Sequence, residues 1–310
     1  MLKAYSVFKD LDKKAYEILT NAGIQLELST SIERPNKEQL EKLLNDYDIL
    51  IIGVKEKLTE DMLAKVEKNK IIATLSIGVD HIDKSFFESD LIKVINCQTS
   101  NVISVAEHIF ALILGVKKRI IEANDIAIKG GNKTQLSDRS NDISSSTIGI
   151  IGAGKISREV IKIAKVFNMK IYCNTLNPEK HKDLLHQGVE FVDLDTLLTN
   201  SDIITINIPL NEENKNLISK DKINLMKKSA TFINTSRAEI VDMNELIKYA
   251  DENKTFNVGL DIDAENYKEI LNTKRNNVIV TPHIAGVTKE AIKRMDVELA
   301  NNIREYLEKN

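Results

Sequence analysis

Short runs of β-branched residues alternate with longer amphipathic stretches, rich in lysine and glutamate, along most of the 310 positions. This alternation is typical of βαβ units and of a mostly parallel sheet. The first series predicts strands at 4–8, 48–53, 70–75 and 93–96, with helices at 11–21, 37–45 and 59–68. The second predicts strands at 147–151, 169–173, 203–208, 230–234, 256–260 and 278–281. The pattern predicts an α/β protein with two doubly wound parallel-sheet domains, which also suits a length beyond that of one ordinary domain.

Between the two series, residues 101–128 are helical in pattern and apolar on most of their faces. A helix of that kind must be buried, and we expect it between domains or subunits. Residues 130–146 are polar, with paired glycines and three consecutive serines, so we expect a surface loop there. After the second series, 289–308 is an amphipathic helix with no strand behind it.

Charge and cysteine content narrow the classes of function. The chain has 43 lysines and arginines against 46 acidic residues, a net charge of −3, which gives no sign of nucleic acid as a partner. No apolar run approaches the ~18 residues of a membrane span, and we expect no export signal at the N-terminus. The two cysteines, Cys97 and Cys173, lie far apart and fit neither a disulfide framework nor a metal site. We therefore expect a cytoplasmic location, no membrane and no metal.

A glycine-rich turn, with Gly152 and Gly154, follows the expected strand at 147–151 and precedes a helical pattern. In a dinucleotide-binding turn the first glycine permits the tight turn and the second lets the backbone approach a pyrophosphate. N–H groups at the start of the helix, at Lys155 and Ile156, would bind the phosphates. Ser157 stands where a third glycine or alanine is usual, and it is small enough for close helix–strand packing. The segment predicts a dinucleotide site.

The next strand bears on which dinucleotide binds. In such folds this strand ends in an acidic residue that binds the adenosine ribose. Here it ends at Asn174 and Thr175, with no acid. The missing carboxylate removes repulsion against a 2′-phosphate, although no arginine is placed to bind one. We expect NAD(H) as the cofactor, with NADP(H) also admissible.

Polar residues follow four later strands of the second series, at the edge where doubly wound folds bind ligands. A single residue of this kind is commonly a loop residue or a cap, but four groups in register indicate a site. The residues are Asn207 with Pro209, then Asn234, Thr235, Ser236 and Arg237, then Asp261, and finally Thr281 with His283.

These motifs, in this order and spacing, resemble the D-isomer-specific 2-hydroxyacid dehydrogenases, the family that includes D-lactate, phosphoglycerate and glycerate dehydrogenases. The resemblance covers nearly the whole chain and rests on 76–83, 101 with 104–108, 152–157, 201–203, 209–210, 233–237, 260–261 and 282–286. It implies a Rossmann domain at 99–284, inserted into a flavodoxin-like substrate domain built from 1–98 and 285–310. It also implies a homodimer that forms through the cofactor domains.

The resemblance assigns the catalytic roles to two residues. Arg237 would bind the substrate carboxylate and polarise the carbonyl, which suits a permanently charged, bidentate guanidinium. His283 would donate the proton in reduction and accept it in oxidation, a task that suits imidazole near neutral pH.

The acid expected beside this histidine departs from the family pattern. Counting forward from Asp261 leads to Asn266, whereas counting back from His283 leads to Glu265. We expect Glu265 in this role, with Asp263 as a minor candidate. If Asn266 occupied the position, the imidazole would lose its electrostatic partner and hold its proton less tightly.

The remaining site residues also follow from the resemblance. Asp261 would contact the nicotinamide carboxamide, unless it is a buried structural residue, and Pro209, Thr235 and Ser236 would lie against the cofactor. Backbone N–H groups of the loop with Ile77, Gly78 and Val79 would bind the substrate carboxylate, and glycine permits that close approach. Lys55 and Lys57 are candidates for a second anionic group of the substrate, or are simply solvated.

The sequence therefore predicts an NAD(P)-dependent oxidoreductase that transfers a hydride between the cofactor and a small D-2-hydroxy acid or 2-keto acid. Two alternatives stay open. The chain could be an NAD(H)-sensing binding protein of the co-repressor type, or a relative that oxidises another small anion such as formate or phosphite.

Overall fold

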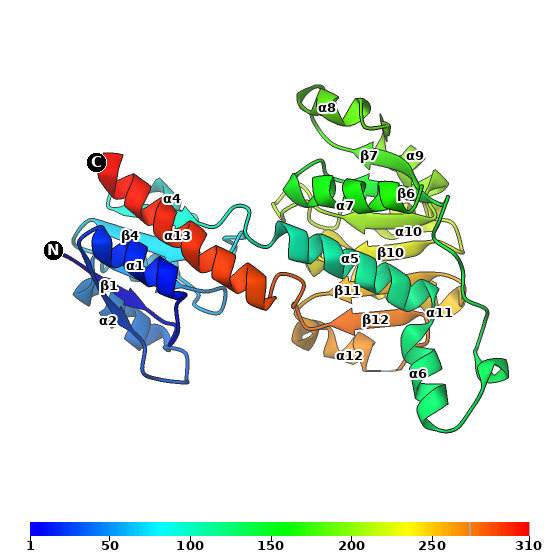
Figure 1. The fold of residues 1–310 in the computed structure, drawn as a ribbon, viewed down its shortest axis with the longest axis horizontal. Coiled ribbons are helices and arrows are strands. Elements are labelled where there is room, and N and C mark those ends of the chain that lie inside the picture. Colours follow the sequence, from blue (N-terminus) through cyan, green and yellow to red (C-terminus); the bar gives the residue numbers. More distant parts are fainter. Residues whose placement is uncertain (273, 310) are drawn as a thin grey trace. The chain divides into compact units, whose positions relative to one another are not determined.

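The computed structural model describes residues 1–272 and 274–309. The chain folds into two units: the first combines Met1–Asn101 with Val287–Asn310, and the second is the continuous stretch Val102–Gly286 (Figure 1). The second unit is therefore an insertion in the first. The sequence predicted the crossings after residue 98 and before residue 285, and the structure has them after Asn101 and after Gly286.

Five parallel strands form the sheet of the first unit, in the order β2-β1-β3-β4-β5. This is the strand order of flavodoxin-like folds, as predicted. The strands are β1 (Leu2–Ser6), β2 (Ile24–Leu28), β3 (Ile49–Ile52), β4 (Lys70–Thr74) and β5 (Ile92–Asn96). The helices are α1 (Lys13–Asn21), α2 (Lys37–Asp46), α3 (Glu60–Leu63), α4 (Ser85–Glu88) and α13 (Lys289–Lys309).

Both faces of this sheet are covered by helices. Successive strand residues point to opposite faces. Ile49 and Ile51 therefore pack with α1 and α13, which lie side by side (Figure 1), while Leu50 and Ile52 pack on the other face with α2, α3 and α4. Burial on both faces explains why β3 contains no polar residue.

Seven parallel strands form the sheet of the second unit, in the order β12-β11-β10-β9-β6-β7-β8. Read from β6 outward, this is the Rossmann order with one more strand, as predicted. The strands are β6 (Thr147–Ile151), β7 (Lys170–Asn174), β8 (Val189–Phe191), β9 (Ile203–Ile206), β10 (Thr231–Asn234), β11 (Asn257–Asp261) and β12 (Val278–Thr281). The α-helices are α5 (Val102–Lys117), α6 (Ile120–Ile128), α7 (Lys155–Val166), α8 (Lys182–Leu185), α9 (Leu194–Asn200), α10 (Lys220–Leu225), α11 (Met243–Glu252) and α12 (Lys268–Leu271). Four short 3₁₀ turns are Lys133–Gln135, Pro178–His181, Ala238–Ile240 and Ala264–Tyr267.

Helices α5 and α7 cover one face of this sheet, and α9, α10 and α11 cover the other. The predicted apolar helix thus buries its surface within the second unit, against β10, β11 and β12 (Figure 1). Gly259 on β11 makes room for it, because a Cβ atom there would lie 3.0 Å from Cβ of Leu112.

Two strands were missed by the sequence pattern, and one helix was predicted too long. The strands β2 and β8 lie at the edges of the two sheets, so each has a single neighbouring strand and carries polar residues on its outer face. The helix expected at 59–68 is confined to α3, Glu60–Leu63.

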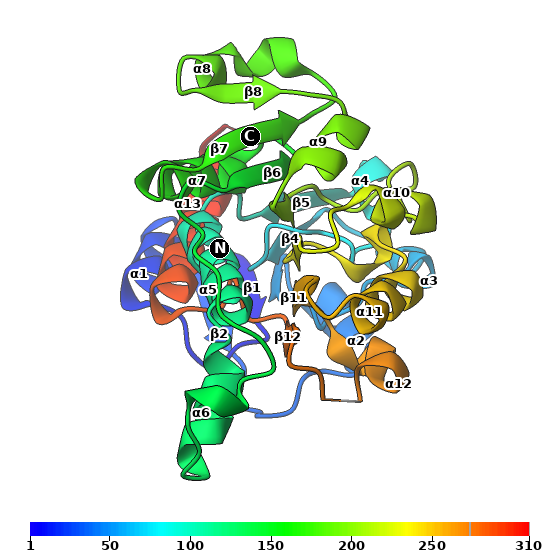
Figure 2. The same ribbon diagram turned by 90° about the vertical axis from the view of Figure 1, so that its right-hand side faces the viewer.

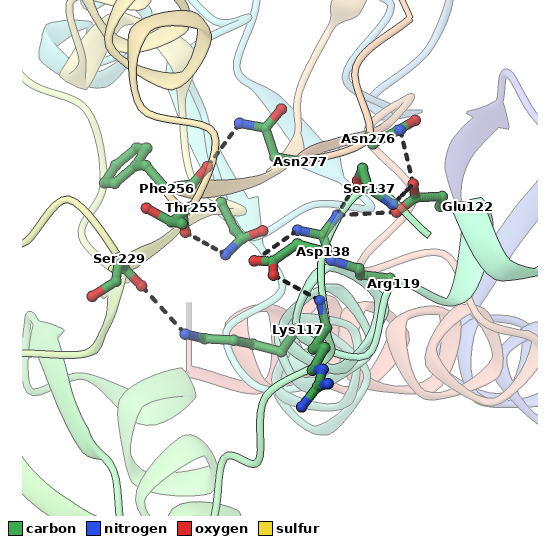
Figure 3. Close-up of polar contacts among 12 residues, drawn as sticks. Lys117, Arg119, Glu122, Ser137, Asp138, Ser229, Thr255, Phe256, Asn276 and Asn277 are labelled. Carbon is green, nitrogen blue, oxygen red and sulfur yellow. Dashed lines mark hydrogen bonds and ion pairs between the residues drawn. The ribbon is translucent and has the colours of Figure 1, made fainter. Parts of the chain in front are cut away.

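The helical pattern at 101–128 is broken at Arg119, which has φ +53 and separates α5 from α6. Its buried guanidinium donates to Glu122 Oε2 at 3.0 Å and to Ser137 Oγ at 2.7 Å (Figure 3). Glu122 Oε1 accepts from Ser137 N at 2.7 Å and from Asn276 Nδ2 at 3.0 Å. Burial opposes the charge on Glu122, but these bonds and Arg119 hold the pKa of its carboxyl below the usual value. The network ties the loop at 129–146 to the helices, and it offsets the strain at Arg119.

The chain leaves the first unit along a segment held by α13. The Glu298 carboxylate accepts from Gln98 N at 2.7 Å, from Thr99 N and Oγ1, and from Ser100 Oγ. Arg294 Nε donates to the Ser100 carbonyl at 2.7 Å. The last helix therefore fixes the position of the outgoing crossing.

Within 1–272 and 274–309, no helix combines the length and apolar character that crossing a membrane requires. Cys97 and Cys173 are free and buried, and burial raises the pKa of each thiol to about 12.

Candidate active site

Gly152 follows β6 with φ +101, a backbone conformation that L-residues rarely adopt. Its N–H donates to the Asn174 carbonyl at 2.8 Å, which joins the turn to the end of β7. A Cβ atom here would lie 2.7 Å from the Asn207 carbonyl oxygen, so the turn packs directly on the backbone that follows β9. Glycine is the residue that meets both demands.

Gly154 caps the start of α7 under different constraints. Its φ is −73, and a Cβ atom there would meet nothing within 4 Å, so the space beside it is open. No side chain caps this helix, and the first N–H groups of an α-helix have no partner within the helix. Open space beside uncapped N–H groups suits an anion such as the pyrophosphate of a dinucleotide.

Ser157 closes the turn, as the motif predicted for a small residue. It is fully buried, and its Oγ accepts from Asn207 Nδ2 at 3.3 Å. Asn207 Oδ1 in turn accepts from Thr205 Oγ1 at 3.3 Å. The asparagine after β9 thereby links strand and helix beneath the glycine turn.

The end of β7 carries no acid, as the sequence indicated. Asn174 uses its Nδ2 to donate to the Val192 carbonyl at 3.0 Å, so this amide holds the backbone after β8. Arg158 of α7 reaches the segment after β7, where it bonds His181 Nδ1 at 3.3 Å and pairs with Asp183. The ion pair holds the pKa of the Asp183 carboxyl below its usual value.

At the end of β10, the fully buried Asn234 shapes the turn that carries Arg237. Its Oδ1 accepts from Ser236 N at 2.9 Å, and its Nδ2 donates to the Arg237 carbonyl at 2.8 Å. Ser236 Oγ donates to the Ile206 carbonyl at 2.9 Å, which joins the turn to β9. The guanidinium of Arg237 donates to the Ser236 carbonyl at 3.0 Å and is half-buried. These bonds set the direction in which the predicted substrate-binding arginine leaves the sheet.

His283 follows β12 with φ +54, in the left-handed region that costs a non-glycine residue about 1–2 kcal/mol. Asp261, at the end of β11, is fully buried and offsets this cost. Its Oδ1 accepts from Ile284 N at 2.8 Å, and its Oδ2 accepts from Ala285 N at 2.7 Å. Strain of this kind concentrates at functional sites, where the surrounding structure holds it. The predicted contact of Asp261 with the nicotinamide stays a prediction.

The carboxylate that lies within reach of His283 is Asp263, whose Oδ1 is 3.6 Å from Nδ1 of the imidazole. Glu265 lies in the following 3₁₀ turn with its side chain exposed. The structure thus pairs the histidine with the minor candidate, and the assignment of Glu265 stays a prediction.

In the first unit, carbonyl groups of the loop after β4 accept hydrogen bonds from side chains of the same unit. Ser76 Oγ donates to the Gly78 carbonyl at 2.7 Å, and Asn96 Nδ2 donates to the Ile77 carbonyl at 2.8 Å. Thr74 Oγ1 lies 2.9 Å from Ser76 Oγ and 3.0 Å from His81 Nε2. Within the described part of the chain, no acceptor is bonded by the N–H groups of residues 77–79. A loop with satisfied carbonyls and available N–H groups suits a carboxylate ligand.

The strand ends of the second unit meet at one edge of its sheet because all seven strands are parallel. A family model described as "D-isomer specific 2-hydroxyacid dehydrogenase, NAD binding domain" matches residues 110–285, which carry these strand ends. The chain belongs to the D-isomer-specific 2-hydroxyacid dehydrogenase family.

Individual relatives extend the match along the chain. A hydroxypyruvate reductase of Thermotoga maritima is 33% identical over 94% of this chain and 94% of its own. A glyoxylate reductase of Thermococcus litoralis is 35% identical over 90% of this chain and 86% of its own. Among solved structures, an acyclic imino acid reductase in complex with NADPH and D-Arg superposes with a TM-score of 0.88, at 29% identity over 99% of this chain and 98% of that one.

Membership of the 2-hydroxyacid dehydrogenase family makes the chain an oxidoreductase of small 2-hydroxy and 2-keto acids, with a nicotinamide cofactor bound by the second unit. Neither the co-repressor nor the formate or phosphite alternative is favoured by these comparisons. In residues 1–272 and 274–309, no three histidine, cysteine, aspartate or glutamate side chains are grouped to hold a metal ion.

Three residues of this site were given no individual function by the prediction. Asn207 and Asn234 follow β9 and β10 directly, and they were among the polar strand-end residues that indicated the site. His108 lies inside a matched motif of the 2-hydroxyacid dehydrogenases, but its Nε2 meets Thr281 Oγ1 at 2.9 Å only because α5 packs on β12. No local pattern reports such a contact.

Proposed function

We propose that the protein reduces a small 2-keto acid to the 2-hydroxy acid, either glyoxylate to glycolate or hydroxypyruvate to D-glycerate. The observation that carries this proposal is the placement of Arg237 and His283 after β10 and β12, at the same sheet edge as the glycine turn. Two strand spacings separate these strands, about 10 Å, which is room for a small acid between a cation and an imidazole. The names of the two relatives described above support the choice of substrates.

The roles follow from chemistry. The bound nicotinamide cofactor supplies or accepts the hydride at the substrate's C2. Arg237 binds the substrate carboxylate and draws electron density from the carbonyl oxygen, while His283 donates a proton to that oxygen in reduction and removes it in oxidation. The N–H groups of Ile77, Gly78 and Val79 remain our candidates for the substrate carboxylate. Lys155, Ile156, Pro209, Thr235, Ser236 and Asp261, with both glycines of the turn, Asn174 and Thr175, remain our candidates for holding the cofactor.

A carboxylate next to the imidazole would favour its protonated form. The distance of 3.6 Å between Asp263 Oδ1 and His283 Nδ1 supports Asp263 in this role, and Glu265 is the alternative from the family pattern. Replacing Asp263 and Glu265 one at a time distinguishes the two assignments by experiment.

We propose that NADH and NADPH bind with similar affinity. No carboxylate ends β7 to repel a 2′-phosphate, and the guanidinium of Arg158 is paired with Asp183. The end of β7 thus has neither a carboxylate that repels a 2′-phosphate nor an arginine that is available to bind one. The affinities for NADH and NADPH should therefore differ by no more than about tenfold, or about 1.4 kcal/mol. Competition of the two cofactors in isothermal titration measures this ratio directly.

We also propose a homodimer formed through the cofactor unit. Helix α6 extends away from the sheet of its own unit (Figures 1 and 2) and exposes Ile120, Ile121 and Ile128. Apolar side chains on a helix that covers no core of its own are typical of a subunit contact. The cytoplasmic location expected from the sequence also stays a prediction.

The decisive experiment is a steady-state assay with NADH and NADPH against glyoxylate, hydroxypyruvate, pyruvate and phenylpyruvate, with formate and phosphite offered in the oxidative direction. We expect turnover with the first two acids and a D-configured product from hydroxypyruvate. His283→Ala should bind cofactor normally and lose turnover. Tight cofactor binding without turnover of any acid would instead make the protein a sensor, and NAD reduction by formate or phosphite alone would make it a relative with another substrate.

A further inference from the structure

Three side chains from α5, β12 and β11 form a hydrogen-bonded chain behind the loop of His283. Nε2 of His108 lies 2.9 Å from Oγ1 of Thr281, and this hydroxyl lies 2.6 Å from Oδ1 of Asp261. Asp261 is fully buried, and the His108 side chain is only 18% exposed. The imidazole therefore lies away from bulk solvent, next to a charged group.

The direction of these bonds is fixed by the groups themselves. An ionised carboxylate only accepts, and a threonine hydroxyl has one hydrogen to donate. The short contact shows where that hydrogen goes, because a bond to a charged acceptor is the stronger one. Oγ1 of Thr281 must then accept from His108, which requires the hydrogen of the imidazole on Nε2. The hydrogen bonds are therefore all donated in one direction, from His108 to Thr281 and from Thr281 to Asp261.

The far end of the chain holds the backbone of the proposed proton donor. Oδ1 and Oδ2 of Asp261 accept from the N–H groups of Ile284 and Ala285, the two residues after His283. Rotation of the carboxylate would break both bonds, and the left-handed conformation of His283, at φ +54, would lose its support. Thr281 prevents this rotation by binding Oδ1, and His108 prevents rotation of Thr281.

We propose that His108 is a positioning residue, which fixes the direction of the His283 imidazole through Thr281 and Asp261. The inference rests on the proposed role of His283 in proton transfer. Helix α5 packs on β10, β11 and β12, so the position of His108 is set by the core of the second unit. These hydrogen bonds thus connect the packed core of the second unit to the position of the imidazole that transfers the proton.

Four variants test this chain. His108→Leu removes the donor but keeps apolar volume, and His108→Gln restores an N–H near the position of Nε2. Thr281→Val removes the hydroxyl, and Thr281→Ser keeps it. His186→Leu is the matched control, because this histidine is exposed on the same unit.

For His108→Leu and Thr281→Val we expect kcat to fall about 10- to 30-fold, the effect of losing one hydrogen bond next to a charged group. KM for glyoxylate should stay within about twofold, and His108→Gln and Thr281→Ser should recover most of the loss. Because both residues act through one chain, the double variant should lose no more than either single variant. Losses that multiply, or an unchanged kcat in His108→Leu, would each overturn the proposal.

A second measurement does not depend on turnover. Hydrogen exchange of the Ile284 and Ala285 amides, followed by mass spectrometry of the NADH complex, should accelerate at least tenfold in His108→Leu and Thr281→Val but not in His186→Leu. Unchanged exchange would refute the positioning role. If the wild-type protein turns over none of the acids, the proposed function fails, while the exchange data still decide whether the chain holds the loop. Thr281→Val carries the test if His108→Leu does not fold.

Discussion

The two glycines of the βα turn should fail in different ways when each is replaced by alanine. At Gly152, φ is +101, and the new Cβ atom would lie 2.7 Å from the Asn207 carbonyl oxygen and 2.7 Å from Ile208 Cγ2. The backbone conformation costs about 1–2 kcal/mol and the overpacking about 1–3 kcal/mol. We therefore expect Gly152→Ala to destabilise the cofactor unit by about 2–5 kcal/mol, a fall in Tm of roughly 5–15 °C for a unit of this size.

At Gly154 the same methyl group meets no protein atom. The backbone already has φ −73, and nothing lies within 4 Å of the added Cβ. Stability without cofactor should therefore change by less than about 1 kcal/mol, since the unfolded chain also loses some freedom. The methyl group instead occupies the open space predicted for the pyrophosphate, so the Kd for NADH should rise about tenfold or more.

Thermal unfolding without and with NADH, together with isothermal titration, separates the two effects. Wild-type protein should gain Tm on binding NADH, because a ligand of the folded state stabilises it. Gly154→Ala should show the wild-type Tm without cofactor and a smaller gain with it. A Gly152→Ala variant with an unchanged Tm, or a Gly154→Ala variant that binds NADH normally, would refute this reading of the turn.

Three further predictions concern other parts of the chain. Asp263→Asn should lower kcat and shift the pH profile of reduction to lower pH, with Glu265→Gln near wild type; the opposite ranking would return the role to Glu265. Burial, reinforced by the charge of a neighbouring carboxyl, raises the pKa of Asp296 to about 6, so this residue favours folding below about pH 4 and loses that contribution as pH rises through 6. Urea denaturation should then show Asp296→Asn more stable than wild type by about 1–3 kcal/mol at pH 8 and not at pH 4, and an equal effect at both values would contradict this. Replacing Ile121 and Ile128 together by lysine should give a monomer by light scattering; a monomeric wild type, or a variant of unchanged mass, would disprove the α6 interface.

Features that depend only on residues close together in the sequence were predictable. The turn at Gly152 and Gly154 needs a particular backbone conformation and open space, and both needs appear directly as residue types. The central strands of each sheet are buried on both faces, so they appear as continuous apolar runs. The strand order followed from the family resemblance and not from the pattern, because hydrophobic periodicity does not say which strands are neighbours.

Features that depend on packing between distant segments were not predictable. The helical sequence pattern continues through Arg119, but the helix itself ends there. A buried ion pair with Glu122 and the hydrogen bond to Ser137 stabilise the left-handed conformation of Arg119. The pairing of Asp263 with His283 depends on how β11 and β12 end beside each other, and counting residues led to Glu265 instead. Spacing along the chain locates a site but does not choose between carboxylates two residues apart.

The interrupted first unit imposes an order on folding during synthesis. Its sheet is made early, but one face is completed by Met295, Leu299 and Ile303 of α13, which also holds the crossing at 98–100 through Glu298. The whole cofactor unit is translated between these two events, which at roughly 5–20 residues per second takes about 10–40 s. All strands of the inserted unit are synthesised before α13, and until α13 is made one apolar face of the N-terminal sheet stays uncovered. A chain truncated after residue 286 should therefore carry a cofactor unit able to bind NADH beside an N-terminal segment still sensitive to protease.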